Sequence, residues 1–333
     1  MDNINIFSSP PYPILIARST IMFLNGLRRI ERDMLITFSG NIAIWNTIEP
    51  RRYHMKRLTS AEKPETIEGR QYHIACAPGD VAPYVLLPGD PERVVRIAKY
   101  WDYYELKAKH REYVTYTGRY KGVPISATST GIGSESTAIA IEELLRVGAH
   151  TFIRVGTTGA IVKDVKIGDL VISTGAVRLE GTSKQYVIVE YPAVANYEVV
   201  LALVEAAEQL GVRYHVGITA SISSFYVGQG RPGFKGYIPR WSKTIVDDLR
   251  AVNVLNFEME ASTIFTLANI YGARAGAVCA VIANRVTNEF IVDAGVEDAI
   301  MVANEAVRIL HEWDEIKRRF KKKYFYPSLL RSS

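Results

Sequence analysis

The chain has 333 residues, 48% of them hydrophobic and 23% charged, as expected for a globular protein large enough to bury a substantial core. No apolar run is long enough to cross a bilayer, so neither a membrane span nor a membrane partner is expected. The net charge of +5 comes from the ends: residues 1–70 carry ten basic and seven acidic side chains, residues 316–333 carry seven basic and no acidic ones, and the body between them is at −5. A nucleic-acid partner is not expected, because such proteins usually carry positive charge on the folded body.

The first 70 residues lack the pattern of the rest. Their short apolar runs alternate with prolines and basic pairs, and no small-residue cleavage site follows, so a signal peptide is not favoured. We expect residues 1–54 to be a disordered extension or a mistaken start upstream of Met55. The division expected is an N-terminal extension over residues 1–70, a folded domain over residues 71–315 and a basic tail.

The chain has two cysteines, Cys76 and Cys279. Both lie in apolar surroundings without the spacing of a metal site, and either can be a small core residue. This usage of cysteine favours a reducing, cytoplasmic location.

The folded part begins with a short strand and a helix. The apolar run Tyr84–Pro88 predicts a buried strand, and Pro91 fits the first turn of the helix that follows. Between them, Gly89 lets backbone amides approach a ligand. Arg93, near the start of the helix, can reach the same anion.

The next stretch predicts strand, helix and strand, with a glycine-rich turn after each strand. The strands are Val123–Ala127 and Thr151–Val155, and Ser134 or Ser136 can cap the helix between them. Such a βαβ unit belongs to a parallel sheet, in which ligands collect beyond the carboxyl ends of the strands. The exposed amides and hydroxyls of both turns suit phosphate.

Arg154 lies inside the second of these strands. An unpaired guanidinium there would cost several kcal/mol in an apolar setting, so Arg154 needs an anionic partner. Two partners fit the sequence: a carboxylate in an internal salt bridge, or a phosphate held in a forked grip.

The remaining strands and helices keep alternating. A hydroxyl-rich loop carries Gln229 and Arg231, and two carboxylates flank Met259 where a strand passes into a helix. A long amphipathic helix over residues 296–318 closes the body, and the tail beyond it is expected to be a solvated helix end and a frayed terminus. The sequence thus predicts a single-domain α/β protein, a three-layer sandwich around a mixed, largely parallel sheet.

Together, these groups suggest a phosphate site, a carboxylate that can bind a diol, and an amide and guanidinium suited to a planar ring rich in carbonyls. Phosphate, ribose and base in one site suggest cleavage of a nucleoside. The segments LLPGDPERV, HREYVTYTG, STGIGSESTAIAIEELLRVGAHTFIRVGTTGAI, SSFYVGQGRP and NFEMEAST follow one another in the order typical of one family. Over roughly residues 71–315 the chain resembles the nucleoside phosphorylase superfamily, specifically its hexameric branch and the members that cleave uridine.

The resemblance implies a pentosyltransferase that converts uridine and inorganic phosphate to uracil and α-D-ribose 1-phosphate in pyrimidine salvage, without a further cofactor. It also implies a homohexamer, a trimer of dimers, with active sites shared across the dimer interface. The alternatives are a purine nucleoside or 5′-methylthioadenosine phosphorylase of the same fold, a hydrolytic nucleosidase, and a non-catalytic nucleoside-binding protein.

The resemblance also assigns roles to individual residues. It implies phosphate contacts for Gly89, Arg93, Arg154 and Thr157, and for Arg111 supplied by a neighbouring subunit. It implies ribose contacts for Thr157, Met259 and Glu260, and for His73 reaching across the dimer interface. It implies base contacts for Phe225, Gln229 and Arg231, and a monovalent cation site, for example for K⁺, at Glu112, Ile132 and Ser136. The catalytic residues it implies are Arg93, Arg154 and Glu260.

The choice of base depends on Asn284 and on the Gln229 loop. Purine-specific relatives carry an aspartate at the position of Asn284, because a purine leaves after protonation at N7. Uracil can instead leave as a delocalised anion stabilised by Gln229 and Arg231, so no strong acid is required. Gly230 and Pro232 replace the bulkier residues common in the family, which leaves the choice among uridine, thymidine and deoxyuridine open.

Overall fold

The computed structural model describes residues 15–20, 31–36 and 58–332. The chain divides into two compact units, Met1–Lys56 and Arg57–Ser333. In the first unit, β1 (Leu15–Thr20) and β2 (Glu31–Ile36) form an antiparallel pair. The prediction for residues 1–54 falls mostly outside the described residues and stays a prediction.

The second unit begins before residue 71. Glu65 and Gln71 form an antiparallel bridge, and the side-chain amide of Gln71 donates to the Glu65 carboxylate at 2.9 Å. Arg70 forms an ion pair with Asp80 at 3.3 Å. The segment that we expected to precede the domain is therefore tied to it by pairing and by charge.

The second unit is built on one mixed sheet of eleven strands. The strands are β3 (Tyr84–Leu87), β4 (Tyr103–His110), β5 (Tyr113–Tyr120), β6 (Val123–Thr128), β7 (Thr151–Ala160), β8 (Leu170–Leu179), β9 (Ala193–Val194), β10 (Tyr214–Ile222), β11 (Val254–Glu258), β12 (Arg274–Asn284) and β13 (Glu289–Phe290). The pairs β3–β6, β3–β7, β7–β12, β8–β10 and β10–β11 are parallel, and the other pairs are antiparallel. Because β12 pairs with both β7 and β8, the strands β7, β12, β8, β10 and β11 close into a ring.

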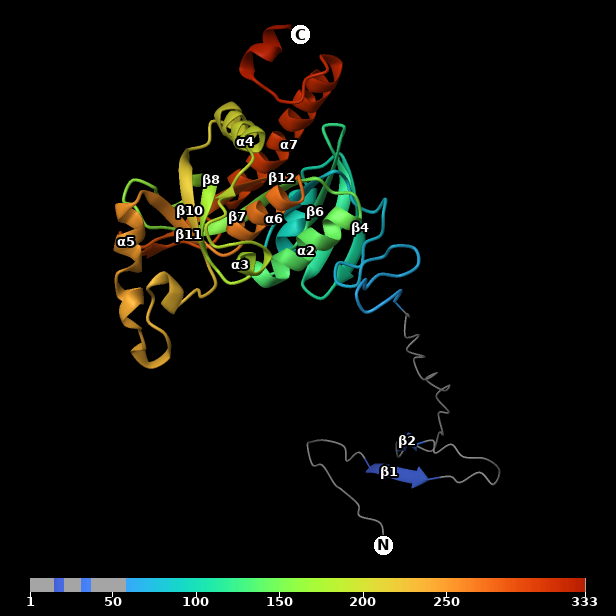
Figure 1. The fold of residues 1–333 in the computed structure, drawn as a ribbon. Coiled ribbons are helices and arrows are strands. Elements are labelled where there is room, and N and C mark those ends of the chain that lie inside the picture. The colour runs from blue at the N-terminus through green and yellow to red at the C-terminus, as the bar shows by residue number, and fades with distance from the viewer. Residues whose placement is uncertain (1–14, 21–30, 37–57, 333) are drawn as a thin grey trace. The chain divides into compact units, whose positions relative to one another are not determined.

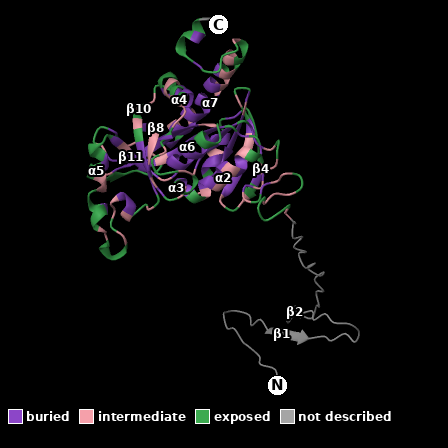
Figure 2. Ribbon diagram, viewed as in Figure 1, coloured by how far each residue is buried: buried purple, intermediate pink, exposed green. Residues whose placement is uncertain are grey.

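Helices cover both faces of this sheet (Figure 1). They are α1 (Pro91–Ala98), α2 (Ser134–Arg146), α3 (Ser183–Tyr186), α4 (Tyr197–Leu210), α5 (Ile245–Ala251), α6 (Ala261–Ile270) and α7 (Val296–Arg319). One hydrophobic core packs α1, α4 and α7 against the sheet, and a second packs α2 and α6 against it. Figure 2 shows the buried residues concentrated in the strands and on the helix faces turned toward them. The predicted α/β sandwich with a mixed sheet is confirmed. None of the helices in the described ranges is long and apolar enough to cross a membrane.

The ends of α1 and α4 follow the sequence signals. The Asp90 side chain accepts from the Glu92 amide at 2.8 Å and caps α1, with Pro91 in the first turn. Gly211 ends α4 in the left-handed conformation that glycine adopts at low cost.

The start of α2 differs from the prediction. Its cap is Gly133, with φ of 98°, and no side chain caps the helix. Ser134 instead donates to the carbonyl of Met259 at 3.0 Å, which ties α2 to the turn after β11. The prediction that Ser134 or Ser136 caps the helix was wrong, because Ser134 makes a tertiary contact and Ser136 bonds carbonyls of the preceding turn.

The chain after α7 folds back onto the body. Phe325 is buried and stacks on Trp313 with ring centroids 3.9 Å apart, and its amide donates to Glu198 at 3.0 Å. Leu329 is buried as well. The expectation of a frayed terminus was wrong for this segment, because its apolar side chains extend the main core.

Replacement of Phe325 by alanine is expected to lower the free energy of unfolding by about 3 kcal/mol, since it removes a stacked, buried ring. Tyr326, which is exposed, provides the matched control: Tyr326→Ala should change stability by no more than about 0.5 kcal/mol. Urea unfolding followed by tryptophan fluorescence measures both. Equal stability of the two variants would show that the segment does not pack on Trp313.

Candidate active site

The predicted site residues lie where several strands end. Gly89 follows β3, and the turn through Gly131 follows β6. These two turns are in contact, because a Cβ at Gly89 would lie only 3.1 Å from the carbonyl oxygen of Gly131. The amide of Gly133 donates to Glu260, just after β11, at 2.6 Å. The three strand ends therefore form one cluster.

Arg154 on β7 sits between two buried carboxylates. Its Nη2 lies 2.6 Å from Oε2 of Glu260, and its Nε lies 2.8 Å from Oε2 of Glu258, though without the angle of a hydrogen bond. Burial lowers the pKa of Arg154, but the two carboxylates outweigh it and the net shift is upward. Arg154 thus has the salt-bridge partners that the sequence left open, and it remains charged.

Glu258 is held rigidly. One oxygen accepts from the Ser221 hydroxyl on β10, and the other accepts from the amides of Glu260 and Ala261 at 2.8 Å each. The two amides belong to the start of α6, where backbone donors are free to bind an anion. Glu258 can therefore fix the position of the Arg154 guanidinium.

Glu260 is almost fully buried, and this burial raises its pKa despite the opposing charge of Arg154. Among residues 58–332, Oε1 of Glu260 accepts from the amide of Gly133, and Oε2 pairs with Arg154. A carboxylate oxygen can accept more than one hydrogen bond, so Glu260 can still bind a donor such as a sugar hydroxyl.

Arg93 is a buried cation without a carboxylate partner in residues 58–332. Its Nη1 donates to the carbonyl of Val155 at 3.2 Å, and its Nε has no hydrogen-bond partner. Burial and the nearby charge of Arg154 lower its pKa. A buried guanidinium in this state is costly unless an anion binds it.

The space between Arg154, Gly156 and Cys279 is fully packed. A Cβ at Gly156 would lie 2.8 Å from Cζ and Nη2 of Arg154 and 2.8 Å from Sγ of Cys279. Cys279 is fully buried, and burial raises the pKa of its thiol to about 11. The expectation that Cys279 is a small core residue is confirmed.

The loop after β10 brings its polar residues together. Arg231 donates to the side-chain oxygen of Gln229 and to the carbonyl of Phe225 at 2.8 Å, and its Cζ lies 4.1 Å from the centre of the Phe225 ring. Burial and the charge of Arg285 lower the pKa of Arg231 to about 10, so it is cationic at neutral pH. Arg285 anchors the loop by donating to the carbonyl of Gln229 at 2.7 Å.

This loop reaches the end of β7. A Cβ at Gly159 would lie 3.7 Å from Nη2 of Arg231. Thr157, two residues earlier on the same strand, is half-buried. The carboxyl-terminal part of β7 thus lies next to a predicted base residue, Arg231, and carries a predicted phosphate residue, Thr157.

Asn284, at the end of β12, has every side-chain position engaged. Its amide nitrogen donates to the carbonyls of Val162 and Val165 at 3.1 and 2.8 Å, and its oxygen accepts from the amides of Val286 and Thr287 at 2.8 and 3.0 Å. The side chain fixes two loops and holds no acidic proton.

His73 and Arg111 form a separate group. His73 and Ile74 are held by the buried carboxylate of Glu143, which lies 2.7 Å from Nδ1 of His73. Arg111 is exposed and donates to the Tyr72 hydroxyl at 3.2 Å. Within residues 58–332 neither side chain forms a hydrogen bond or an ion pair with Arg93, Arg154 or Glu260.

The three residues of the predicted cation site surround one turn. A Cβ at Gly131 would lie 3.0 Å from Cγ of Glu112 and 3.2 Å from Oγ of Ser136. The Ser136 hydroxyl also donates to the carbonyl of Ile132 at 3.4 Å. The Glu112 side chain, the Ser136 hydroxyl and the Ile132 carbonyl therefore lie around the same turn, and each carries oxygen that can bind a cation. Residues 58–332 hold no cluster of three or more His, Cys, Asp or Glu side chains that could bind a metal ion.

Sequence reasoning missed three residues that position the others: Glu258 as the partner of Arg154, Glu143 as the partner of His73, and Arg285 as the anchor of the Gln229 loop. The motif NFEMEAST already signalled Glu258. A lone Glu143 in a helix gave no comparable signal.

Gly156→Ala is expected to lower the free energy of unfolding by about 1–3 kcal/mol, because the added methyl group would displace the Arg154 guanidinium or the Cys279 thiol. Gly181→Ala is the control, since a Cβ at Gly181 meets no atom within 4 Å. Thermal and urea unfolding measure both variants. A Gly156→Ala protein as stable as Gly181→Ala would mean that this space is not filled.

The sequence is similar to those of known phosphorylases. A uridine phosphorylase of Thermococcus kodakarensis is 66% identical over 275 residues, which cover 83% of this chain and 99% of that protein. A uridine phosphorylase of Escherichia coli is 41% identical over 244 residues, covering 72% and 95%. A guanosine phosphorylase of Halorubrum lacusprofundi is 46% identical over 217 residues, covering 65% and 85%. The family model described as the phosphorylase superfamily matches residues 83–312, and the chain therefore belongs to that superfamily.

Proposed function

We propose that this enzyme catalyses the phosphorolysis of uridine, giving uracil and α-D-ribose 1-phosphate. The observation that carries the phosphate half of this proposal is Arg93, a buried guanidinium that has no carboxylate partner among residues 58–332. The uracil half is supported by the pair Gln229 and Arg231 and by the likeness to uridine phosphorylases.

Phosphate would lie between the turn that contains Gly89 and Thr157 on β7. Arg93 and Arg154 would bind its oxygens, and the partner subunit's Arg111 would complete the grip. Because Arg111 is exposed and its guanidinium donates to Tyr72, not to a group of the cluster in its own chain, a shared site gives it a role. Backbone amides at Gly89 can add neutral donors without adding charge.

Ribose would lie against Met259, with its hydroxyls donating to Glu260. Glu260 accepts from Gly133 and Arg154 already, so its orientation is set before the sugar arrives. Thr157 would contact the sugar from β7, and the partner subunit's His73 would reach the 5′-hydroxyl. A pre-set acceptor saves the entropy of ordering it during the reaction.

Uracil would bind in the plane of Gln229 and Arg231, with Phe225 near the base and sugar. An amide and a guanidinium offer donors to carbonyl oxygens, and the amide oxygen can accept from a ring N–H. As the glycosidic bond lengthens, negative charge grows on the uracil ring. The cationic Arg231 would stabilise that charge, which removes the need for a strong acid.

The reaction would proceed by attack of a phosphate oxygen on C1′ while the bond from C1′ to the base breaks. Both electrons of the breaking bond leave with uracil, and the sugar passes through a cationic state that the phosphate charge stabilises. Attack from the opposite face inverts C1′ and gives the α-anomer. Holding both reactants in line can supply roughly 7–11 kcal/mol of the barrier.

A purine nucleoside is the second candidate, because one relative at 46% identity is a guanosine phosphorylase. Asn284 argues against it, since its amide is engaged by four backbone groups and cannot protonate N7. We further propose a cytoplasmic homohexamer built as a trimer of dimers, with a monovalent cation such as K⁺ near Glu112, Ile132 and Ser136.

The proposal is tested by incubating the protein with uridine, inosine, guanosine or 5′-methylthioadenosine, each with and without inorganic phosphate. We expect uracil to appear only when phosphate is present, together with ribose 1-phosphate. Purine release would leave the phosphate site standing and refute the assignment of the base. Release of base without phosphate would refute phosphorolysis.

Arg93→Met is expected to lower kcat/KM for phosphorolysis on the order of a hundredfold or more, because one preorganised donor to phosphate is lost. The free energy of unfolding should stay unchanged or rise, since the variant replaces an unpaired buried cation by an apolar side chain. Arg96 on the same helix pairs with Glu297 at the surface, so Arg96→Met is the control and should keep its activity. Equal kinetics of the two variants would remove Arg93 from the phosphate site.

Arg231→Lys is expected to raise KM for uridine about tenfold and to leave KM for phosphate unchanged, because lysine lacks the forked donor that meets a planar ring. Lys235→Gln, an exposed change in the same region, should leave both constants unchanged. Steady-state kinetics with each substrate varied in turn measure the effects. A rise in KM for phosphate alone would contradict the base assignment.

A further inference from the structure

A large cavity lies away from the active site, at the opposite end of the strands. It measures about 780 Å³ and is lined by residues that precede or begin three parallel strands: Tyr84 of β3, His150 before β7, and Arg274 of β12. On the same strands the active-site residues lie further along: Gly89 follows β3, Thr157 lies in the second half of β7, and Asn284 ends β12. From Thr151 to Thr157 alone, β7 spans about 20 Å, so the cavity is not part of the phosphorylase site.

Two acids in the cavity wall are neutralised within it. Arg274 lies 3.0 Å from Glu198 and 2.6 Å from Asp314. Lys317 lies 2.6 Å from Glu198 and 2.9 Å from Asp314. Asp314 also accepts from the Tyr84 hydroxyl at 2.6 Å. These contacts lower the pKa of Asp314 to about 2 against the effect of burial, and they lower the pKa of Glu198 as well, so both carboxylates stay charged at neutral pH.

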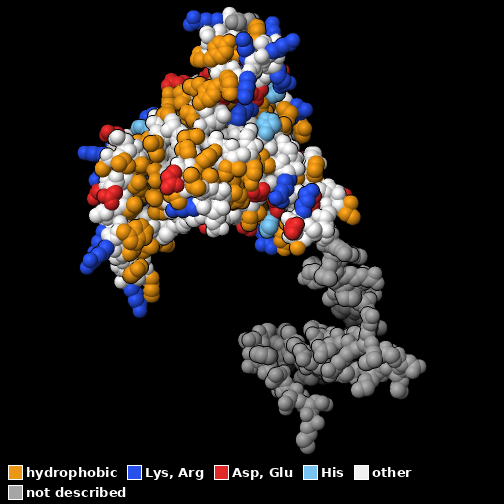
Figure 3. Space-filling view, viewed as in Figure 1, with side chains coloured by type: hydrophobic (Ala, Val, Ile, Leu, Met, Phe, Trp, Pro, Cys, Tyr) orange, Lys and Arg blue, Asp and Glu red, His pale blue; other side chains and the backbone are white. Residues whose placement is uncertain are grey.

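The wall then has a surplus of positive charge. Lys321, Lys322 and Lys323 line the cavity, and no ion pair joins any of them to an acid in residues 58–332. Arg318 lines it as well and pairs with Glu315, which is not part of the wall. Figure 3 shows Lys and Arg side chains gathered around the C-terminal segment, at the top of the view. This wall is suited to an anion with several charges.

Backbone hydrogen bonds hold the turn formed by Lys321, Lys322 and Lys323, which we call the lysine turn. The amide of Lys321 donates to the carbonyl of Arg318 at 3.2 Å, and that of Lys322 donates to Lys317 at 2.9 Å. Beyond the turn, Phe325 is fixed by its stacking on Trp313. The lysines are thus presented on an ordered turn, so less entropy is lost when an anion binds.

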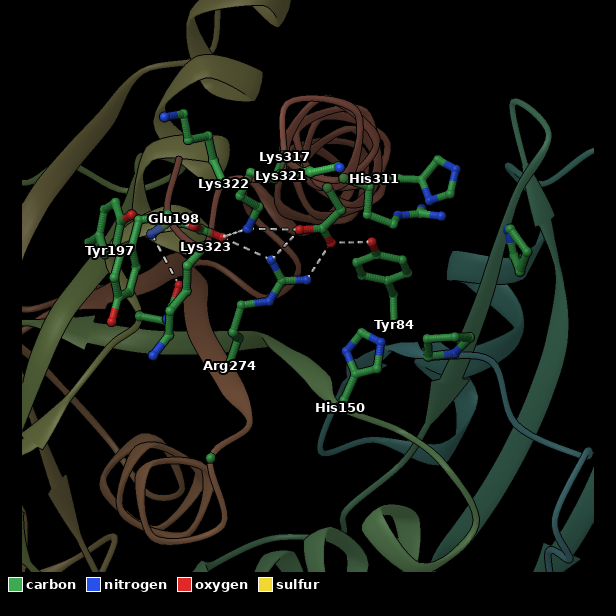
Figure 4. A pocket seen from close by; sticks show the side chains of 17 residues that line it. Tyr84, His150, Tyr197, Glu198, Arg274, His311, Lys317, Lys321, Lys322 and Lys323 are labelled. Atoms are coloured by element: carbon green, nitrogen blue, oxygen red, sulfur yellow. Dashed lines mark hydrogen bonds and ion pairs between the residues drawn. The ribbon is translucent and has the colours of Figure 1, made fainter. Parts of the chain in front are cut away.

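Aromatic rings complete the wall. Tyr197 and Tyr324 lie beside the lysine turn, and Tyr84 packs edge-on against His150 with ring centroids 5.7 Å apart. Figure 4 shows Lys322, Lys323 and Tyr197 on one side of Arg274, and Tyr84 and His150 on its other side. Rings near a cluster of cations suit a ligand that joins a planar base to phosphate groups.

We propose that this cavity, which we call the lysine pocket, binds a nucleoside di- or triphosphate. Lys321, Lys322 and Lys323, which form no ion pair among residues 58–332, would bind the phosphate groups, and the tyrosine rings would contact the base. The volume lies within the usual range for small-molecule sites, roughly 300–1,000 Å³. A nucleoside without phosphate would gain little here, so the lysine pocket and the phosphorylase site would select different ligands.

The test is isothermal titration of the full chain with ATP, with inorganic tripolyphosphate and with uridine, using variants of the lysine turn. Lys322→Gln/Lys323→Gln should weaken ATP binding tenfold or more, and Lys322→Arg/Lys323→Arg should preserve it, because only the first variant loses charge. Lys99→Gln/Lys163→Gln removes two exposed lysines outside the wall and should leave binding unchanged. Binding by Arg93→Met should also be unchanged, which separates this site from the phosphorylase site.

Several results would overturn the proposal. ATP binding that survives Lys322→Gln/Lys323→Gln would place the ligand elsewhere, and binding lost in Arg93→Met would place it in the phosphorylase site. Tripolyphosphate that binds as tightly as ATP would show that no base is recognised. A single-stranded oligonucleotide that binds while ATP does not would make the lysine turn a nucleic-acid contact. Phosphorolysis by the lysine variants shows that they are folded.

Discussion

The site depends on how buried charge is shared among three strand ends. Arg154 faces two buried carboxyl groups, Glu258 and Glu260, so this triad has two acidic groups for one guanidinium. Arg93, nearby, carries a positive charge that no carboxylate in residues 58–332 balances. The pKa values respond in the expected directions, upward for Glu260 and downward for Arg93. An anion that binds beside Arg93 would balance the charge of this unpaired guanidinium.

The fold makes this arrangement possible by bringing distant segments to one edge. Glu258 is set by a hydroxyl from β10 and by amides at the start of α6, and Glu260 is set by an amide at the start of α2. Each carboxylate is therefore oriented by backbone of a different element. Such support keeps charged side chains in position without relying on their own rotamer preferences.

Local signals in the sequence were enough to predict much of the fold. Asp90 and Pro91 mark the start of α1 through contacts within a few residues, and Gly211 marks the end of α4 in the same way. The α/β class and the cluster of strand ends followed from the order of strands and turns. The ring closed by β12 did not, because pairing with β8 and β7 on opposite sides depends on tertiary packing.

The same distinction holds for the site. Ordered motifs identified Arg93, Arg154 and Glu260, but the pairing of Arg154 with Glu258 joins residues more than a hundred positions apart, and sequence alone left salt bridge and phosphate as alternatives. The prediction that Ser134 caps α2 was wrong because its tertiary partner is a carbonyl beyond β11.

The ring of strands closed by β12 also affects how the protein avoids aggregation. Its strands offer no open edge, and within residues 58–332 the path of strands ends at β4 and at the two-residue β13. The long open edge, β4, has the sequence YYELKAKH, whose alternating charges discourage another chain from adding a strand.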